Sequence, residues 1–126
     1  MDREEALAYW LAPEHEVFVA ANGVETNGTY FLQANPEAGA EVANCGYMTA
    51  PAAFGRGIAS AMCLHSLARA KECGFSAMRF NFVVATNERA VRLWQSLGFE
   101  ILERLPRAFP HPTLGAVDAL VMQRAL

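Results

Sequence analysis

The stretch that most restricts the fold lies between residues 41 and 84, where two strand patterns flank a helical one. Residues 41–49 (EVANCGYMT) and 77–84 (AMRFNFVV) are predicted as strands. The helix between them is predicted at 56–72, with Gly74 as its C-terminal stop. Two strands joined by a helix are expected to be parallel neighbours in one sheet, with a right-handed crossover.

Strands and helices on either side extend this unit. In chain order, the other predicted elements are a helix at 4–11, strands at 15–21 and 28–33 around an Asn22-Gly23 turn, a helix from Thr86 or Asn87 to Gly98, and strands at 99–104 and 117–123. Residues 105–116 carry three prolines and are predicted as a long loop. This order predicts one domain over residues 1–126, an α/β (α+β) fold with a mixed sheet sandwiched by helices.

Apolar spacing predicts which side of each helix is buried. The predicted apolar face of the 56–72 helix is Ile58, Ala61, Met62, His65 and Ala68, and that of the next helix is Ala90, Val91, Trp94 and Leu97. Within strand 41–49, Gly46 is a poor strand residue, and an isolated glycine there indicates a bulge or a close backbone approach.

Composition excludes several classes of protein. A hydrophobic share of 53% against 18% charged residues excludes a disordered chain, and no apolar run approaches the roughly 18 residues of a membrane span. A formal net charge of -3 provides no basic surface for nucleic acid or acidic membranes. The charged first residues are unlike a signal peptide, and the three cysteines form no CxxC pair, so we expect a cytoplasmic protein with free thiols. Three scattered histidines have no metal-ligand spacing, so no metal site is expected.

A glycine-containing turn, Phe54-Gly55-Arg56-Gly57-Ile58-Ala59, leads into the first of these helices. Its two glycines allow a tight turn and let a ligand approach the backbone without a Cβ in the way. The free N–H groups and the dipole of a helix start favour an anion, and Arg56 adds a positive side chain. The chain contains neither a Walker A string nor a complete Rossmann GxGxxG. By itself the turn is therefore either a phosphate site or a plain helix start with a glycine hinge.

A second motif favours the phosphate site. Residues 87–99 (NERAVRLWQSLGF) resemble the NxxAxxLYxxxGF helix of the GNAT superfamily of N-acetyltransferases, and residues 54–59 resemble its [RQ]xxGx[GA] pyrophosphate loop. The resemblance covers residues 14–126 and implies a mixed sheet of about six strands with helices on both faces. The resemblance also implies that the family's usual first strand is absent and that the chain is N-terminally short, and a homodimer is expected to cover the open sheet edge.

The resemblance also implies where acetyl-CoA binds. It would lie in the V between strands 41–49 and 77–84, with the backbone of Met48 and Thr49 beside the pantetheine arm. Asn87 would hydrogen-bond the pantetheine or pyrophosphate region, or else serve only as a helix cap. The remaining cofactor-binding residues implied are Phe54, Gly55, Arg56, Gly57, Ile58, Ala59 and Ser60.

Two positions depart from the family pattern. Phe54 replaces the usual Arg or Gln, which is expected to weaken a site made mainly of backbone amides. Trp94 replaces the Tyr that hands a proton to the departing thiolate; because indole cannot donate a proton, Trp94 is either a catalytic contact or a core aromatic. Asn81 is the other catalytic candidate, and it either orients the substrate or is a structural amide. The general base is sought among Glu41, Asn44, Asn81 and His111.

These expectations predict acetyl transfer from acetyl-CoA to the amine of a small, amino-acid-like molecule, by direct attack in a ternary complex. We expect the rate to depend mainly on how the two substrates are positioned and on a strand N–H near Met48 that polarises the thioester carbonyl. Strong acid–base residues would contribute less. Two alternatives stay open. One is a weak or inactive acyl-CoA-binding module, and the other is a binding domain for a different nucleotide.

Overall fold

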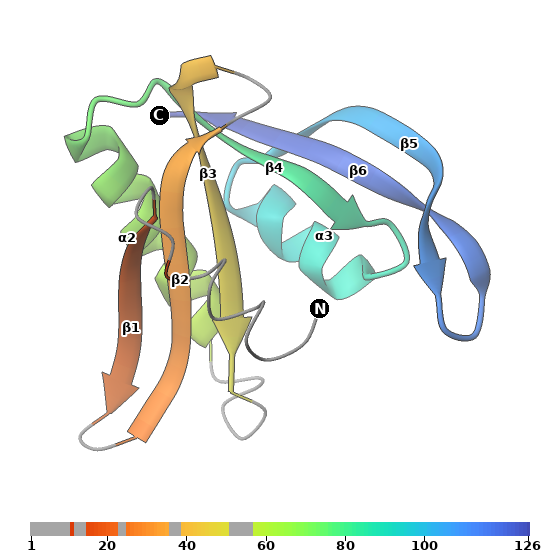
Figure 1. The fold of residues 1–126 in the computed structure, drawn as a ribbon, viewed down its shortest axis with the longest axis horizontal. Helices are drawn as coiled ribbons and strands as arrows, with labels where there is room; N and C mark the ends of the chain where they lie inside the picture. The colour runs from red at the N-terminus through yellow and green to blue at the C-terminus, as the bar shows by residue number, and fades with distance from the viewer. Residues whose placement is uncertain (1–10, 12–14, 23–24, 36–38, 51–56) are drawn as a thin grey trace.

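Six strands form one mixed sheet in the order β1-β2-β3-β4-β6-β5 (Figure 1). The structure is a computed structural model that describes residues 11, 15–22, 25–35, 39–50 and 57–126. Its elements are β1 (Glu16–Asn22), β2 (Glu25–Asn35), β3 (Gly39–Thr49), α2 (Ile58–Glu72), β4 (Ala77–Val84), α3 (Glu88–Ser96), β5 (Glu100–His111) and β6 (Gly115–Ala125). The helix predicted at 4–11 lies outside the described residues.

The strand pairings confirm the predicted mixed sheet. β1, β2 and β3 are antiparallel neighbours, and β4, β6 and β5 are also joined by antiparallel pairs. The two halves meet at β3 and β4, which are parallel, as the connection through α2 predicts. This parallel contact is short, and Figure 1 shows β3 and β4 diverging beyond it.

Both described helices pack on the same face of the sheet. Tyr47 of β3 hydrogen-bonds Ser66 of α2, and its ring also lies 5.4 Å, centroid to centroid, from that of Trp94 in α3. The sequence analysis predicts helices on both faces of the sheet. Among the described residues no helix covers the opposite face, and the helix predicted at 4–11 lies outside them.

The buried side of α2 differs from the prediction. The residues that it buries are Met62, Cys63, Ser66, Leu67 and Ala70, whereas Ala61, His65 and Ala68 are exposed. Small or apolar residues occur on nearly every side of this helix, so its periodicity does not select one face. For α3 the predicted stripe is confirmed, since Val91, Trp94 and Leu97 pack against the core.

The predicted loop at 105–116 is wrong, because most of it is strand. β5 continues to His111, and β6 begins at Gly115. The prolines that suggested a loop are compatible with this strand for two reasons. β5 is an edge strand, and Pro106 lies where the register with β6 shifts between Leu105 and Phe109.

Neither described helix is long and apolar enough to cross a membrane.

Candidate active site: a fork between two strands

The centre of the site is the fork between β3 and β4. Their pairing consists of Val42 with Ala77 and Ala43 with Met78, after which the strands separate. A groove of about 590 Å³ occupies the opening. The residues that line it are Phe31, Asn44, Cys45, Gly46, Tyr47, Phe80, Asn81, Phe82, Val83, Val84, Asn87, Ala90 and Trp94.

Asn44 lies at the apex of the fork. Its Nδ2 donates a hydrogen bond to the carbonyl oxygen of Arg79 in β4, at 3.0 Å. A side chain of β3 thus contacts the backbone of β4 directly beyond the last paired residues. Asn44 is among the bases that the sequence suggests. This hydrogen bond instead gives it a structural role, because it links β3 to β4 at the point where the two strands separate.

The groove reaches both faces of the sheet. Side chains alternate along a strand, so Tyr47 faces the helices whereas Gly46 faces away from them. Gly46 pairs with Phe31, and a Cβ on Gly46 would lie 2.4 Å from Cε1 of that ring. The sequence indicates a bulge or a close backbone approach at Gly46; the structure shows neither of these, and the group that comes close is the side-chain ring of Phe31.

A second groove, of about 700 Å³, continues from the first on the helix side. It lies between the start of α2 and α3, and the two grooves share Asn87, Ala90 and Trp94. The other residues that line it are Thr49, Gly57, Ile58, Ala59, Ser60, Arg89, Arg92, Leu93 and Ser96. A chain-like ligand can therefore extend from the fork to the beginning of α2 without leaving a groove.

The start of α2 is built to receive an anion. Gly57 adopts the left-handed conformation (φ 75) and has no side chain to cap the helix. The first bond within the helix runs from the Ala61 N–H to the Gly57 carbonyl, at 3.0 Å, so the N–H groups of residues 58–60 precede the helical ladder. These donors and the helix dipole favour a phosphate in the second groove. Phe54, Gly55 and Arg56 lie outside the described residues.

Two arginines on α3 add positive charge to this groove. Arg89 and Arg92 line the second groove opposite the first turn of α2. Sequence reasoning missed both. Their spacing of three residues places them on the same side of a helix, which is the signal that would have found them.

Asn87 is the N-cap of α3. Its Oδ1 accepts a hydrogen bond from the Ala90 N–H at 3.2 Å, which confirms the capping role. The residue also lines both grooves. Because the cap uses the oxygen, contact with a ligand would come from the Nδ2 donors.

Trp94 is a partly buried aromatic that packs against the core and lines both grooves. Its ring packs against Tyr47, Phe80 and Phe99 at centroid distances of 5.4, 4.9 and 6.3 Å. The nearest phenol on the fork is that of Tyr47, and burial raises its pKa far above the usual range. Its hydroxyl is bonded to Ser66 (2.6 Å), so Tyr47 is unsuited to replace the missing tyrosine as a proton donor.

Replacing Ser66 by alanine should destabilise the fold by about 1–3 kcal/mol. Ser66 Oγ donates to the carbonyl oxygen of Cys63 at 2.7 Å, so the Tyr47 hydroxyl donates to Ser66 and would lose its acceptor in a buried place. Urea unfolding measures the loss in the free energy of unfolding.

Two further variants test the cause of this loss. Tyr47→Phe in the Ser66→Ala background should recover most of it. The matched control is Ser96→Ala, which removes a similar bond to Leu93 O (2.6 Å) at an exposed position and should cost under about 0.5 kcal/mol. Equal losses at the two serines would contradict this account.

The structure narrows the list of bases and nucleophiles. Burial raises the pKa of the Cys45 thiol to about 12, so it is not a nucleophile at neutral pH. His111 Nδ1 accepts hydrogen bonds from the N–H groups of Thr113 (3.1 Å) and Leu114 (3.2 Å), which ties this ring to the β5–β6 turn. Asn81 is half-buried and lines the fork. Met48 pairs with Thr29 and is 57% exposed, so any part that it plays would be through its backbone.

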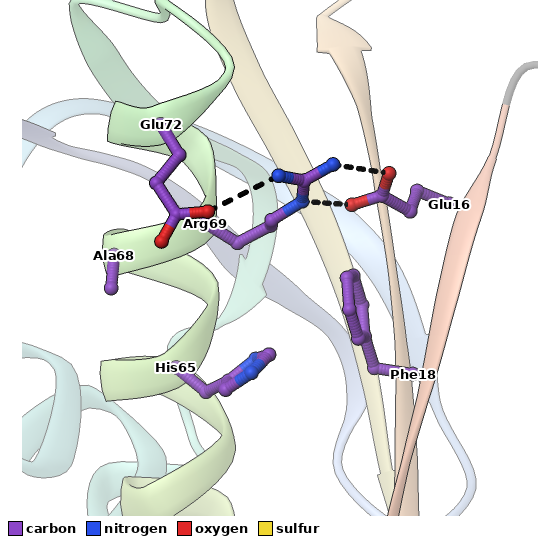
Figure 2. A pocket seen from close by; sticks show the side chains of 6 residues that line it. All are labelled: Glu16, Phe18, His65, Ala68, Arg69 and Glu72. Atoms are coloured by element: carbon purple, nitrogen blue, oxygen red, sulfur yellow. Dashed lines mark hydrogen bonds and ion pairs between the residues drawn. The ribbon is translucent and has the colours of Figure 1, made fainter.

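A separate hollow of about 540 Å³ lies between β1 and α2 (Figure 2). In it, Arg69 Nε and Nη2 donate to the two carboxylate oxygens of Glu16, at 2.5 and 2.9 Å, and Nη1 donates to Glu72 at 3.2 Å. The hydrogen bonds from Arg69 hold the pKa of the Glu16 carboxyl below its usual range. Arg69 is paired with two carboxylates, so the three groups together carry one net negative charge and the hollow offers no site for an anion.

Comparisons with known proteins agree with this geometry. The sequence model of the Acetyltransferase (GNAT) family matches residues 1–99. N-acetyltransferase aca1 of Schizosaccharomyces pombe is 31% identical in an alignment of 100 residues. The alignment covers 76% of this chain and 47% of that protein, so the chain spans about half of this relative. The structure of a GCN5-related N-acetyltransferase from Kribbella flavida superposes with a TM-score of 0.92 at 40% identity, covering 100% of this chain and 78% of that one. An acetyltransferase from Salmonella typhimurium, solved with its cofactor acetyl-CoA, has the same fold (TM-score 0.82, 22% identity, 100% and 75% covered).

Proposed function

This chain belongs to the GNAT family of acetyltransferases, and we propose that it transfers the acetyl group of acetyl-CoA to the amine of a small molecule. One observation carries the proposal. The fork between β3 and β4 is continuous, through Asn87, Ala90 and Trp94, with a groove that ends at the first turn of α2. A long ligand with an anionic group at one end and a reactive group at the other fits that path.

Each end of the path has residues suited to one part of acetyl-CoA. The pyrophosphate would be held by the N–H groups of residues 58–60 and by Arg89 and Arg92. The pantetheine arm would run beside Thr49 and the free edge of β3 into the fork. There a backbone N–H of β3 near Met48 would polarise the thioester carbonyl.

The chemical step would be direct attack by the amine. Its nitrogen lone pair forms a bond to the carbonyl carbon, the carbon–sulfur bond breaks, and CoA leaves as the thiolate. The proton lost by the amine passes to water, and water protonates the sulfur. Because Trp94 carries no ionisable proton and Tyr47 is bonded to Ser66, the chain contributes mainly by binding and orienting the two substrates.

Calorimetry and thiol release together test this function. We expect CoA and acetyl-CoA to bind, ATP to bind at least tenfold more weakly, and thiol to be released from acetyl-CoA when a suitable amine is added. CoA binding without turnover of any amine in a broad panel would favour an inactive acyl-CoA-binding module. Preference for ATP would favour a binding domain for another nucleotide.

Trp94→Phe should leave the turnover rate at saturating substrates within about threefold of that of the wild-type protein. Phenylalanine preserves an aromatic ring among Tyr47, Phe80 and Phe99. It shortens the ring system, but the one polar group that it removes is an N–H that cannot act as an acid. Loss of a true general acid costs about 10²–10⁴-fold in rate. Steady-state thiol release measures the effect. If turnover instead became slower by about two orders of magnitude while CoA affinity stayed unchanged, the indole N–H would have a part in the reaction.

A further inference from the structure

The two mouths of the fork differ in chemistry. On the helix side the fork leads into the groove with Arg89, Arg92 and the start of α2. On the opposite face its lining includes Phe31, Gly46 and Phe82. If acetyl-CoA occupies the helix side, the amine has to reach the thioester from the opposite face.

Phe82, which lines the fork at that second mouth, forms an aromatic pair with a residue of β5. Phe82 of β4 is 50% exposed, and its ring centroid lies 6.2 Å from that of Phe109 in β5. The strands turn both rings away from the helices. Val83 packs in the helix-side core, so its neighbour Phe82 points to the other face. Phe109 pairs with Val117, which alternates with the core residues Leu120 and Met122 of the same strand.

Irregular pairing in two places brings these rings together. Between Phe80 and Val83, β4 has one more residue than the stretch of β6 that it faces, and Phe82 lies in this irregular stretch. β5 has a larger irregularity, since Leu105 pairs with Ala119 and Phe109 with Val117. Bulges of this kind re-aim side chains and are frequent beside active sites.

Asp118 holds the β5 irregularity in place. Arg107 at its centre has φ 53, an unfavourable conformation for a residue with a side chain. Its backbone N–H donates to Asp118 Oδ1 at 3.0 Å, and Arg104 Nε donates to Oδ2 at 2.5 Å. The Arg107 N–H, followed by Arg104, lowers the pKa of the Asp118 carboxyl, so it is ionised at neutral pH.

We propose that Phe82 and Phe109 form the acceptor-side wall of the fork and select amines that carry a flat apolar group next to the amino group. Asp118 is then a positioning residue, which fixes Phe109 by holding the backbone at Arg107. This inference rests on the proposed function, because it takes the fork as the place of acetyl transfer.

The test compares L-phenylalaninamide with L-alaninamide, whose reactive α-amino groups share the same immediate surroundings. Calorimetric titration into the protein saturated with CoA needs no turnover, so the wall is tested even if the protein does not acetylate amines. Wild-type protein should bind phenylalaninamide at least about tenfold more tightly, as burial of an aromatic ring implies. Phe82→Ala and Phe109→Ala should each reduce this preference at least about threefold and leave the affinity for CoA unchanged. Leu114→Ala, a loss of another exposed apolar side chain on the same hairpin, should keep the preference.

Asp118 is tested by a pair of variants. Asp118→Ala removes both acceptors and should reduce the preference as Phe109→Ala does, acting on KM in thiol release and leaving kcat in place. Asp118→Asn retains an oxygen for the Arg107 N–H and should restore the preference. Absence of the preference in wild-type protein, or its survival in Phe82→Ala and Phe109→Ala, would overturn the inference. Failure of CoA to bind, or of every amine to release thiol, would instead overturn the proposed function.

Discussion

An aspartate in place of Ala59 is expected to weaken CoA binding by about 100-fold or more, while the fold stays at least as stable. Ala59 is in the first turn of α2 and lines the groove in which the pyrophosphate is proposed to bind. Two like charges about 4 Å apart near a protein surface repel by about 4 kcal/mol, and 100-fold in affinity corresponds to about 2.7 kcal/mol. The same negative charge stabilises a helix start by about 0.3–1 kcal/mol.

Because the predicted changes in CoA affinity and in stability have opposite signs, the experiment separates a loss of binding from a loss of folding. A variant that misfolds loses both stability and binding, whereas Ala59→Asp should lose binding alone. Calorimetry with CoA and thermal unfolding measure the two effects. Ala61→Asp is the matched control: it places the same charge on the same helix, at an exposed position outside the groove lining, and should change CoA affinity by less than about threefold. Equal effects at the two positions would mean that the pyrophosphate does not bind at the start of α2.

Gly46→Ala is expected to lower the free energy of unfolding by about 1–3 kcal/mol, as overpacking of a buried site usually does. The new Cβ would lie 2.4 Å from Cε1 and 2.8 Å from Cζ of Phe31, whose side chain is only 4% exposed. In a position without this neighbour the same substitution would be neutral or stabilising, because alanine loses less backbone freedom than glycine on folding. The ring of Phe31 is therefore the physical cause of the expected loss.

A double-mutant cycle with Phe31→Leu tests that cause. Leucine removes the ring atoms that the new Cβ would meet, so Gly46→Ala should cost at least about 1 kcal/mol less in the Phe31→Leu background. Urea unfolding of the four proteins provides the coupling free energy. Additive effects would show that the glycine is needed for some reason other than its approach to Phe31. Since both residues line the fork, CoA affinity and thiol release should be followed in the same variants.

The chain order of strands and helices could be predicted because it depends on local signals. Short apolar runs indicate the strands of the 41–84 unit, and a glycine start and stop indicate α2. Asn87 is recognisable as a cap from its place before an apolar stripe, and its Oδ1 does accept the Ala90 N–H. Two residues of the second motif, Asn87 and Trp94, line both grooves.

Other features could not be predicted because they depend on partners far away in the chain. The hydrogen bond from Asn44 to Arg79 joins residues 35 positions apart, and nothing near Asn44 in the sequence specifies it. Arg89 and Arg92 line the same groove as the first turn of α2 only because the two helices lie beside each other in the folded chain. The prolines of β5 suggest a loop, since local rules do not say that a strand is at a sheet edge.

By itself, then, the amino-acid sequence determined the order of the elements, the parallel pair with its helical crossover, and the family. All of these follow from short-range conformational preferences and from two local motifs. Only the tertiary structure decided which side of α2 is buried, how β3 and β4 part around Asn44, and that Phe82 meets Phe109 on the face opposite the helices. The physical reason is that burial, register and close approach are contacts between distant segments, and their free energy exists only once the sheet has formed.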